Sequence, residues 1–375
     1  MPELLLIIVS GMVTVNYLVF LSRIYTGLNR SAKSEVLPES VNYPVSVIIP
    51  FRNEAGILDE CIMSMLGQDY PEDKTEFIFI DDNSTDGSSA VFEKYKDSRI
   101  RLIRVNDGAE GKKHAIEAAV KVAEGEIILS TDADCTHSRE WIRKMAASFD
   151  HDTGFVAGLV KFEEGKTLLN RVQDTEFASL MITAAGLIRA GEPIICSAAN
   201  IAYRKDAFNA VGGFSDNIHL KSGDDEFLMR KINRAGYKVS LCHDPETIVF
   251  TKPASNLREF LRQRQRWASK GLHYESGSLI LKLILIFLFY FLILLLPVLS
   301  ILTGDINLLT AAAVMYLIKI AAESVVLNKG KNIYPLKAGA GLILFTEILH
   351  VPYIVFSSLS GALGNYRWKD RTIRR

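Results

Sequence analysis

The stretch VSVIIP at residues 45–50 is almost entirely apolar and ends in a proline. A strand that is buried on both faces has this pattern, whereas a strand with one face in solvent alternates apolar and polar residues. Further runs of this kind follow, and segments with helical spacing lie between them. The runs are residues 76–80, 100–105 and 126–130, and the helical segments are residues 57–66, 88–96 and 112–123. Strands that alternate with helices predict an α/β fold with a mostly parallel, Rossmann-like sheet.

Acidic residues follow two of these strands, at Asp81-Asp82 and at Asp132-Ala133-Asp134. In a parallel sheet, ligands bind beyond the carboxyl ends of the strands. Two carboxylates spaced D-x-D can share a Mg²⁺ or Mn²⁺ ion, which takes one or two protein carboxylates together with substrate phosphates. A D-x-D on its own is equally well explained as a solvated turn, so the neighbouring motifs have to decide.

Two common phosphate-binding loops are absent from the sequence. No G-x-G-x-x-G follows the first strand, and Gly111-Lys112 lacks the upstream glycine and the following Ser or Thr of a P-loop. Any phosphates of a ligand must therefore be held in another way. A nucleotidyltransferase, which would need a glycine-rich loop near the first strand, is disfavoured for the same reason.

An ordered set of motifs extends over residues 45–270. It consists of SVIIPFRNE (46–54), FIDDNSTDGS (79–88), Gly111-Lys112, Asp132-Ala133-Asp134, VGGF (211–214), GDDE (223–226) and QRQRW (263–267). In this order the motifs resemble the family-2 glycosyltransferases, whose catalytic domain has the GT-A fold. Each motif alone could arise by chance, but the complete set in the family order is specific.

The resemblance implies a role for each motif residue. The donor-binding residues would be Pro50, Glu54, Asp82, Lys112, Asp132 and Arg266. Asp134, together with Asp132, would hold the Mg²⁺ or Mn²⁺ ion. Asp225, with Asp224 beside it, would be the general base that deprotonates the acceptor hydroxyl, which suits a single displacement with inversion. The family often has Glu-Asp at this place, and the alternative interpretation is an acidic first turn of a helix that runs to Arg234.

The QRQRW motif resembles that of cellulose, chitin and hyaluronan synthases and of ceramide glucosyltransferase relatives. The resemblance implies that Arg266 binds the diphosphate as a planar cation and that Gln263 and Trp267 contact the acceptor. The alternative interpretation is a basic amphipathic helix at residues 257–267 that lies on anionic lipid. Both interpretations hold together if the site lies at the membrane surface.

Long apolar runs at both ends of the chain predict membrane segments. Residues 4–21 are long enough to span a bilayer, and Arg23, Arg30 and Lys33 after them place the following domain in the cytosol. Further candidates lie at residues 279–302, 308–327 and 338–363. Because basic residues occur both before and after the last candidate, that segment is either a bent, re-entrant or interfacial hairpin around Pro352, or its tail breaks the charge rule.

The composition of the chain limits which partners and which cysteine chemistry are expected. The chain has 375 residues and a formal net charge of zero, so no global field favours nucleic acid. Its four cysteines are far apart, which predicts reduced thiols rather than a zinc site or disulfides. Trp141 is expected to pack in the core. We expect an anchor at residues 1–25, a polar tether at 31–42, a GT-A domain at 26–272, and a membrane region with a basic tail at 273–375.

The sequence therefore predicts an integral membrane protein of the bacterial inner membrane with a cytosolic catalytic domain. The expected activity is inverting transfer of a hexose from a nucleotide-diphosphate sugar, a UDP-sugar rather than a GDP-sugar, to a lipid or polysaccharide acceptor. The alternative is an inactive donor-binding subunit of a polysaccharide-assembly complex. Asp132, Asp134 and Asp225 argue for activity, because an inactive subunit would be expected to lose metal or base residues.

Overall fold

A computed structural model describes residues 2–30, 43–105, 110–220, 222–271, 273–274, 276–363, 366–368 and 371–373. The tether predicted at residues 31–42 lies outside the described residues. The chain forms two compact units. The sheet unit comprises Ser31–Glu163 and Leu187–Pro253, and the helical unit comprises Met1–Arg30, Glu164–Gly186 and Ala254–Arg375.

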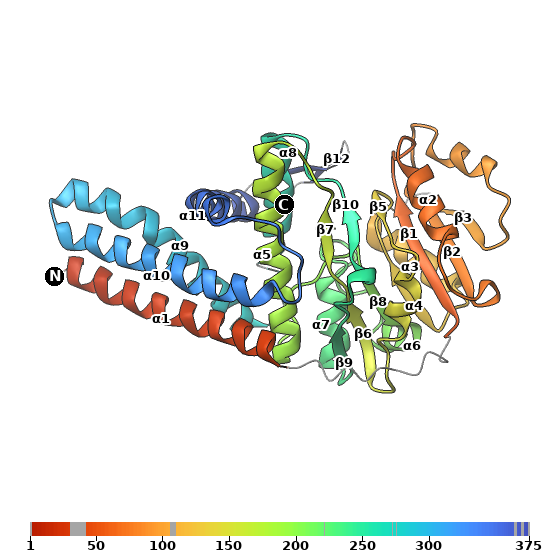
Figure 1. The fold of residues 1–375 in the computed structure, drawn as a ribbon, viewed down its shortest axis with the longest axis horizontal. Helices are drawn as coiled ribbons and strands as arrows, with labels where there is room; N and C mark the ends of the chain where they lie inside the picture. The colour runs from red at the N-terminus through yellow and green to blue at the C-terminus, as the bar shows by residue number, and fades with distance from the viewer. Residues whose placement is uncertain are drawn as a thin grey trace. The chain divides into compact units, whose positions relative to one another are not determined.

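A seven-stranded sheet forms the centre of the sheet unit (Figure 1). Its order is β3 (Ile100–Arg104), β2 (Thr75–Asp81), β1 (Val45–Phe51), β4 (Ile127–Ser130), β8 (Ile201–Arg204), β6 (Thr153–Ala157) and β9 (Lys238–Leu241). Only β8 runs antiparallel to its neighbours in this sheet, β4 and β6. Every residue of β1 is buried, as its unbroken apolar sequence requires. The predicted mostly parallel α/β sheet is confirmed.

Helices and a small second sheet complete this unit. The core on one face of the large sheet contains residues of α3 (Lys112–Val122), α6 (Lys205–Ala210) and α7 (Glu226–Arg234), which pack against β1, β2 and β4. The other helical segments are α2 (Leu58–Leu66), α4 (Trp141–Ala146) and the 3₁₀ turns η1 (Glu72–Lys74), η2 (Ser88–Lys94) and η3 (Pro245–Thr247). The second sheet joins β5 (Cys135–Thr136), β10 (Val249–Thr251) and β7 (Val160–Phe162).

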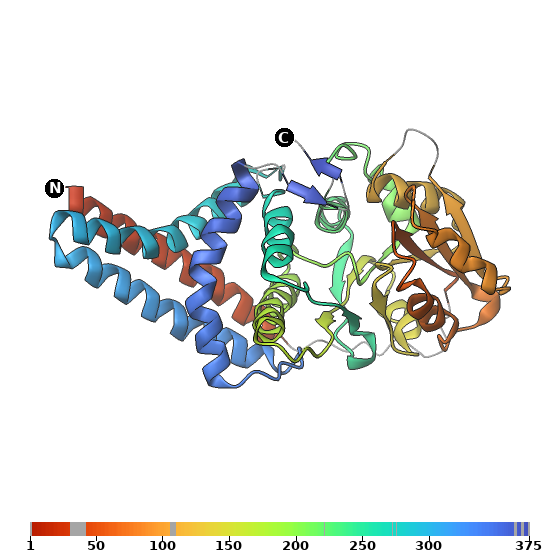
Figure 2. The same ribbon diagram turned by 90° about the horizontal axis from the view of Figure 1, so that it is seen from above.

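The helical unit contains four helices that are long and apolar enough to cross a membrane. They are α1 (Pro2–Asn29), α9 (Gly277–Thr303), α10 (Ile306–Gly330) and α11 (Ala340–Leu363). Within this unit α1, α9 and α10 run side by side, and α11 lies across them (Figures 1 and 2). The unit also contains most of α5 (Leu168–Ala190), α8 (Leu257–Ala268) and the hairpin of β11 (Tyr366–Trp368) and β12 (Arg371–Ile373).

The last apolar segment differs from one expectation. A hairpin around Pro352 was one interpretation of the charge pattern, but a single helix, α11, runs through Pro352. The polar residues of α11 explain why the sequence pattern looked interrupted. Glu347, Val351 and Ser357 belong to a buried face that packs on other helices, whereas Phe345, Ile348 and Phe356 are exposed. Such an inverted distribution is expected where the surrounding medium is lipid.

Candidate active site

Three loops meet where β1 and β2 end, and Asp82 joins them. Its backbone N–H donates to the carbonyl of Phe51 at 2.9 Å, and its own carbonyl accepts from Arg52 Nη1 at 2.7 Å. Its side-chain Oδ1 accepts the N–H of Gly111 at 3.0 Å. Asp82 is buried, at 3% exposure. The backbone of Asp82 therefore joins the end of β2 to the end of β1, and its carboxylate joins both to the start of α3.

The loop after β1 carries Glu54 and is fixed by the loop after β2. The N–H of Glu54 donates to Ser88 Oγ at 2.8 Å, and Asn53 Oδ1 accepts from the N–H of Thr85 at 2.8 Å. Asn53 itself has a φ of 54°, a left-handed conformation that asparagine tolerates better than most residues. Pro50 is buried in β1, one residue before the strand ends at Phe51. The three predicted donor residues Pro50, Glu54 and Asp82 thus lie at one edge of the sheet.

Lys112 forms ion pairs with two of the acidic residues, Asp132 and Asp224. As the first residue of α3 it places Nζ 2.6 Å from Asp132 Oδ1 and 3.0 Å from Asp224 Oδ2. Burial lowers the pKa of Lys112, but the two carboxylates outweigh burial and raise it above its ordinary value. Burial by itself would raise the pKa of Asp224, but the positive charge of Lys112 outweighs burial and lowers this pKa below its ordinary value. One ammonium group therefore links Asp132 of the D-x-D turn to Asp224, the residue before Asp225.

The D-x-D turn follows β4 and remains accessible. The side chain of Asp132 is 38% exposed despite its ion pair, and Asp134 is exposed. The N–H of Cys135 donates to the carbonyl of Asp132 at 3.2 Å and closes the turn. Two carboxylates on one tight turn, both within reach of solvent, fit a Mg²⁺ or Mn²⁺ ion that completes its shell with ligand oxygens.

Two buried thiols, Cys61 and Cys135, lie beside this turn. Burial, together with the charges of Asp134 and Asp132, raises the pKa of Cys61 and of Cys135 well above the ordinary thiol value. Both thiols are buried in the fold beside the acidic turn.

Asp225 stands at the start of α7, and both of its carboxylate oxygens accept backbone hydrogens. Oδ1 accepts the N–H of Glu226 at 2.8 Å, and Oδ2 accepts the N–H of Ala198 at 3.0 Å. The side chain therefore caps the helix, as the alternative interpretation of the motif expects. Each oxygen of a carboxylate has a second lone pair, so capping is compatible with accepting a proton. The base role remains a prediction.

A buried hydrogen-bond network around Asn200 lies beneath the D-x-D turn, and the sequence pattern did not predict it. Asn200 donates to the carbonyls of Leu159 and Thr247 at 2.8 and 2.7 Å and accepts from Trp141 Nε1 at 3.0 Å. The Trp141 ring lies 4.3 Å from that of His137. Trp141 was expected only to pack, and its indole N–H also has this specific partner. No local signal identifies Asn200, because its partners come from distant segments.

His137 connects this network to the strand end. Its Nε2 lies 2.8 Å from Thr131 Oγ1, and that hydroxyl donates to the carbonyl of Ala199 at 2.8 Å. Burial lowers the pKa of His137 to about 3, so the imidazole is neutral at ordinary pH. A neutral imidazole adds no charge beside the D-x-D turn, and its role is to support the loop.

The QRQRW residues lie on α8, in the helical unit. Gln263 Oε1 accepts from Arg264 Nη1 at 2.8 Å. The guanidinium of Arg264 lies 4.1 Å from the centre of the Trp267 ring. Gln263, Arg266 and Trp267 are all partly exposed. Arg264, to which the sequence assigned no role, therefore orders the two residues predicted to contact the acceptor.

We expect Lys112→Met to lower kcat/KM for the donor by roughly 10- to 100-fold, because it leaves Asp132 and Asp224 without their shared cation. Lys112→Arg should restore part of the loss, since it keeps the charge. Donor kinetics and a thermal melt of each variant measure this. Lys121→Met is a matched control, because Lys121 lies on the same helix and is exposed. If Lys112→Met and Lys121→Met had the same donor kinetics, Lys112 would have no role in holding Asp132 and Asp224 for donor use.

Comparisons with known proteins agree with the geometry of the sheet unit. Residues 46–212 match the family described as Glycosyl transferase family 2. The matched range ends before Asp224 and before α8. Glycosyltransferase AglE of Haloferax volcanii is 27% identical over 227 residues, which are 59% of this chain and 71% of that protein. An N-acetylglucosaminyltransferase of Rhizobium meliloti is 28% identical over 236 residues, 60% of this chain and 54% of that protein.

A solved structure extends the likeness to nearly the whole chain. The mannosyltransferase PcManGT of Pyrobaculum calidifontis, in complex with GDP-Man and Mn²⁺, superposes with a TM-score of 0.62 at 20% sequence identity. The superposition covers 96% of this chain and 99% of that protein. It shows that the two chains share a fold, and the predicted GT-A architecture is thereby confirmed.

Proposed function

We propose, starting from the family-2 glycosyltransferase domain that this chain carries, that it transfers a hexose from a nucleotide-diphosphate sugar to a lipid or glycan acceptor with inversion. The observation that carries the proposal is the bridge from Asp132 through Lys112 to Asp224. It joins a D-x-D turn, suited to a metal-bound diphosphate, to the acidic pair that contains the proposed base. A plain nucleotide-binding module would need only the first of these.

The loops after β1, β2 and β4 bind the donor. Pro50, Glu54 and Asp82 hold the base and ribose, and Lys112 and Asp132 contact the donor next to them. Asp134, with Asp132, holds the Mg²⁺ or Mn²⁺ ion, which when bound stabilises the departing diphosphate. Arg266 adds a planar cation for the same diphosphate. The exposure of Asp134 and the turn that fixes Asp132 support these roles.

Acceptor activation falls to Asp225. A carboxylate that is held by two backbone N–H groups has a fixed direction, which general-base catalysis needs. Asp224 remains paired with Lys112 and so holds the Lys112 ammonium group next to the base. One base and one stabilised leaving group suit direct displacement at the sugar carbon, with inversion. Gln263 and Trp267 contact the acceptor, where an aromatic face can pack on a sugar ring.

The second candidate is an inactive donor-binding subunit. It would retain the donor loops but would not need Asp225 next to the Lys112 bridge, so we favour the enzyme. A screen of membranes containing the full chain separates the two. UDP-glucose, UDP-N-acetylglucosamine and GDP-mannose are supplied with Mg²⁺ or Mn²⁺, and nucleoside diphosphate release is measured. A UDP-sugar is our first choice, and donor binding without any release would favour the inactive subunit.

The four apolar helices support a membrane protein. We propose that it lies in a bacterial inner membrane with the sheet unit in the cytosol, where nucleotide sugars are made. Arg23 and Arg30 follow the hydrophobic part of α1, and Lys329 and Lys331 follow that of α10. By the charge rule these flanks are cytosolic. The acceptor is then a lipid or a membrane-emerging glycan rather than a soluble metabolite.

Cysteine labelling of intact cells tests this topology. All four native cysteines are free and buried, so their background reaction with a reagent that cannot cross the membrane should be low. We expect Ser98→Cys in the sheet unit to stay unlabelled, and Thr303→Cys at the end of α9 to react. Ser98 and Thr303 are both exposed in the fold, so a difference between them reports the side of the membrane. If only Ser98→Cys were labelled, the sheet unit would lie outside the cytosol and the proposed topology would be wrong.

A further inference from the structure

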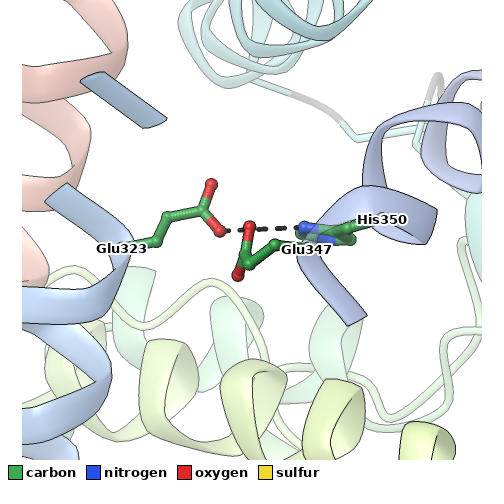
Figure 3. Close-up of side chains that lie close together, drawn as sticks. All are labelled: Glu323, Glu347 and His350. Atoms are coloured by element: carbon green, nitrogen blue, oxygen red, sulfur yellow. Dashed lines mark ion pairs between the residues drawn. The ribbon is translucent and has the colours of Figure 1, made fainter. Parts of the chain in front are cut away.

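An ionic cluster lies between α10 and α11 in the helical unit. Figure 3 shows Glu323 on α10 and Glu347 and His350 on α11 pointing toward one another. Lys319 Nζ contacts Glu323 Oε2 at 3.0 Å and also pairs with Glu347. His350 Nδ1 lies 3.7 Å from Glu323 Oε2. Lys319 is completely buried.

Two tyrosines bring α1 and α9 into the same cluster. Tyr290 of α9 donates to Glu323 Oε1 at 3.2 Å, and Tyr17 of α1 donates to the same oxygen. The two hydroxyls are 2.9 Å apart. Ionisable groups among membrane helices are costly unless they are paired, so these contacts favour one arrangement of the four helices. The cluster therefore fixes the position of α11.

The same cluster has the spacing of a metal site, because ligand atoms of Glu323, Glu347 and His350 lie within 4.8 Å of one another. Lys319 already places a positive charge on both carboxylates. A divalent ion there would meet an ammonium group at the same oxygens. The structure thus favours an ion-pair cluster that joins helices over a metal centre.

A second cluster on α11 reaches the QRQRW helix. Arg264 Nε donates to Glu176 Oε1 of α5 at 3.2 Å, and Arg264 Nη2 pairs with Glu176 Oε2. Tyr353 of α11 donates to Glu176 Oε1 at 2.5 Å. Arg264 and Glu176 are buried, at 4% and 9% exposure. The guanidinium that packs on Trp267 and binds Gln263 is therefore held by Glu176, and Glu176 is held by Tyr353.

Helix α11 also contacts α8 directly. Gln265 Nε2 donates to the carbonyl of Ser360 at 3.1 Å. A Cβ at Gly361 would lie 2.8 Å from the carbonyl oxygen of Gln265, so only glycine allows this approach. The rings of His350 and Tyr353 lie 5.4 Å apart and link the two clusters along α11. One helix thus connects the membrane cluster to α8.

We propose that Glu176 and Tyr353 are positioning residues for acceptor binding. They hold Arg264 against Trp267 and Gln263, and the Lys319 cluster fixes the helix from which Tyr353 acts. This proposal rests on the proposed function, because it takes Gln263 and Trp267 as acceptor contacts. Its consequence is a specific defect: acceptor use weakens while donor use is retained.

Tyr353→Phe is the principal test, because it removes the hydroxyl that binds Glu176 and keeps the ring that packs on Phe260 at 5.5 Å. Purified full-length protein is given the donor found in the screen and vesicles of total membrane lipid from the same cells. We expect the apparent KM for lipid to rise roughly 10-fold, since a hydrogen bond to a charged group is lost. Hydrolysis of the donor by water, measured without vesicles, should remain at the wild-type rate.

Three further measurements keep the result interpretable. Glu176→Gln should give the same defect, and Tyr25→Phe, an exposed tyrosine on α1, should give none. Tryptophan emission should change in Tyr353→Phe and not in Tyr25→Phe, because Arg264 moves relative to Trp267. This second readout needs no acceptor. Unchanged emission together with an unchanged KM for lipid would overturn the proposal, whereas a wild-type protein that never turns over donor would overturn the proposed function instead.

Discussion

Asp225→Asn is expected to lower kcat by roughly 10²–10⁴ while the KM for the donor stays unchanged, the range typical of losing a general base. Asparagine has nearly the same shape as aspartate but cannot take up the acceptor proton. Its side-chain oxygen can still accept the N–H of Glu226 and cap α7, whereas its NH₂ group cannot accept the N–H of Ala198, so one of the two backbone hydrogen bonds is lost. Steady-state kinetics with the acceptor in excess, together with direct donor binding, measure the two effects separately.

Two controls separate catalysis from capping at this position. Asp244→Asn makes the same change in an aspartate that caps the short helix η3 in the same unit, and it should leave kcat unchanged. A melting temperature of Asp225→Asn close to that of the wild type would show that capping persists. Weaker donor binding with an unchanged kcat would instead make Asp225 a binding residue.

Asp134→Ala is expected to reduce turnover about 10³-fold, since a metal ion on the leaving diphosphate contributes several kcal/mol to the transition state. Asp134 is the more accessible carboxylate of the D-x-D turn, and its removal leaves the Lys112 bridge to Asp132 in place. Excess EDTA should reproduce the loss in the wild-type protein, and added Mn²⁺ or Mg²⁺ should reverse it. Metal-dependent turnover and the metal affinity of the protein are the measurements.

A surface aspartate in the same unit provides the comparison for this change. Asp152 is exposed and lies outside the site, so Asp152→Ala should retain full activity. Asp132→Ala should differ from Asp134→Ala, because it also removes a partner of Lys112 and should lower the affinity for the donor as well. Full wild-type activity in saturating EDTA would rule out the metal site.

Local patterns were sufficient to predict the first strands of the sheet, the helices α2 and α3, and the edge at which the candidate residues lie, whereas the helix predicted at residues 88–96 is the 3₁₀ segment η2. Burial on both faces forces β1 to be continuously apolar, so residues 45–50 identify a central strand without any knowledge of its neighbours. The carboxyl ends of β2 and β4 then place Asp82 and the D-x-D turn at the same edge of the sheet. The apolar runs of α1, α9 and α10 are equally visible, because their length has to match a bilayer.

Only the tertiary structure could decide which distant residues meet. The reversed strand β8 enters the sheet between β4 and β6, and this brings Asn200 to Trp141. Lys112 joins Asp132 and Asp224, which are far from each other in sequence. Glu347, one of the polar residues that made the last apolar segment look broken, pairs α11 with Lys319. Tyr353 of the same helix donates to Glu176, which in turn pairs with Arg264. Sequence periodicity reports the environment of a residue, whereas the partner of a buried charge depends on how the whole chain is packed.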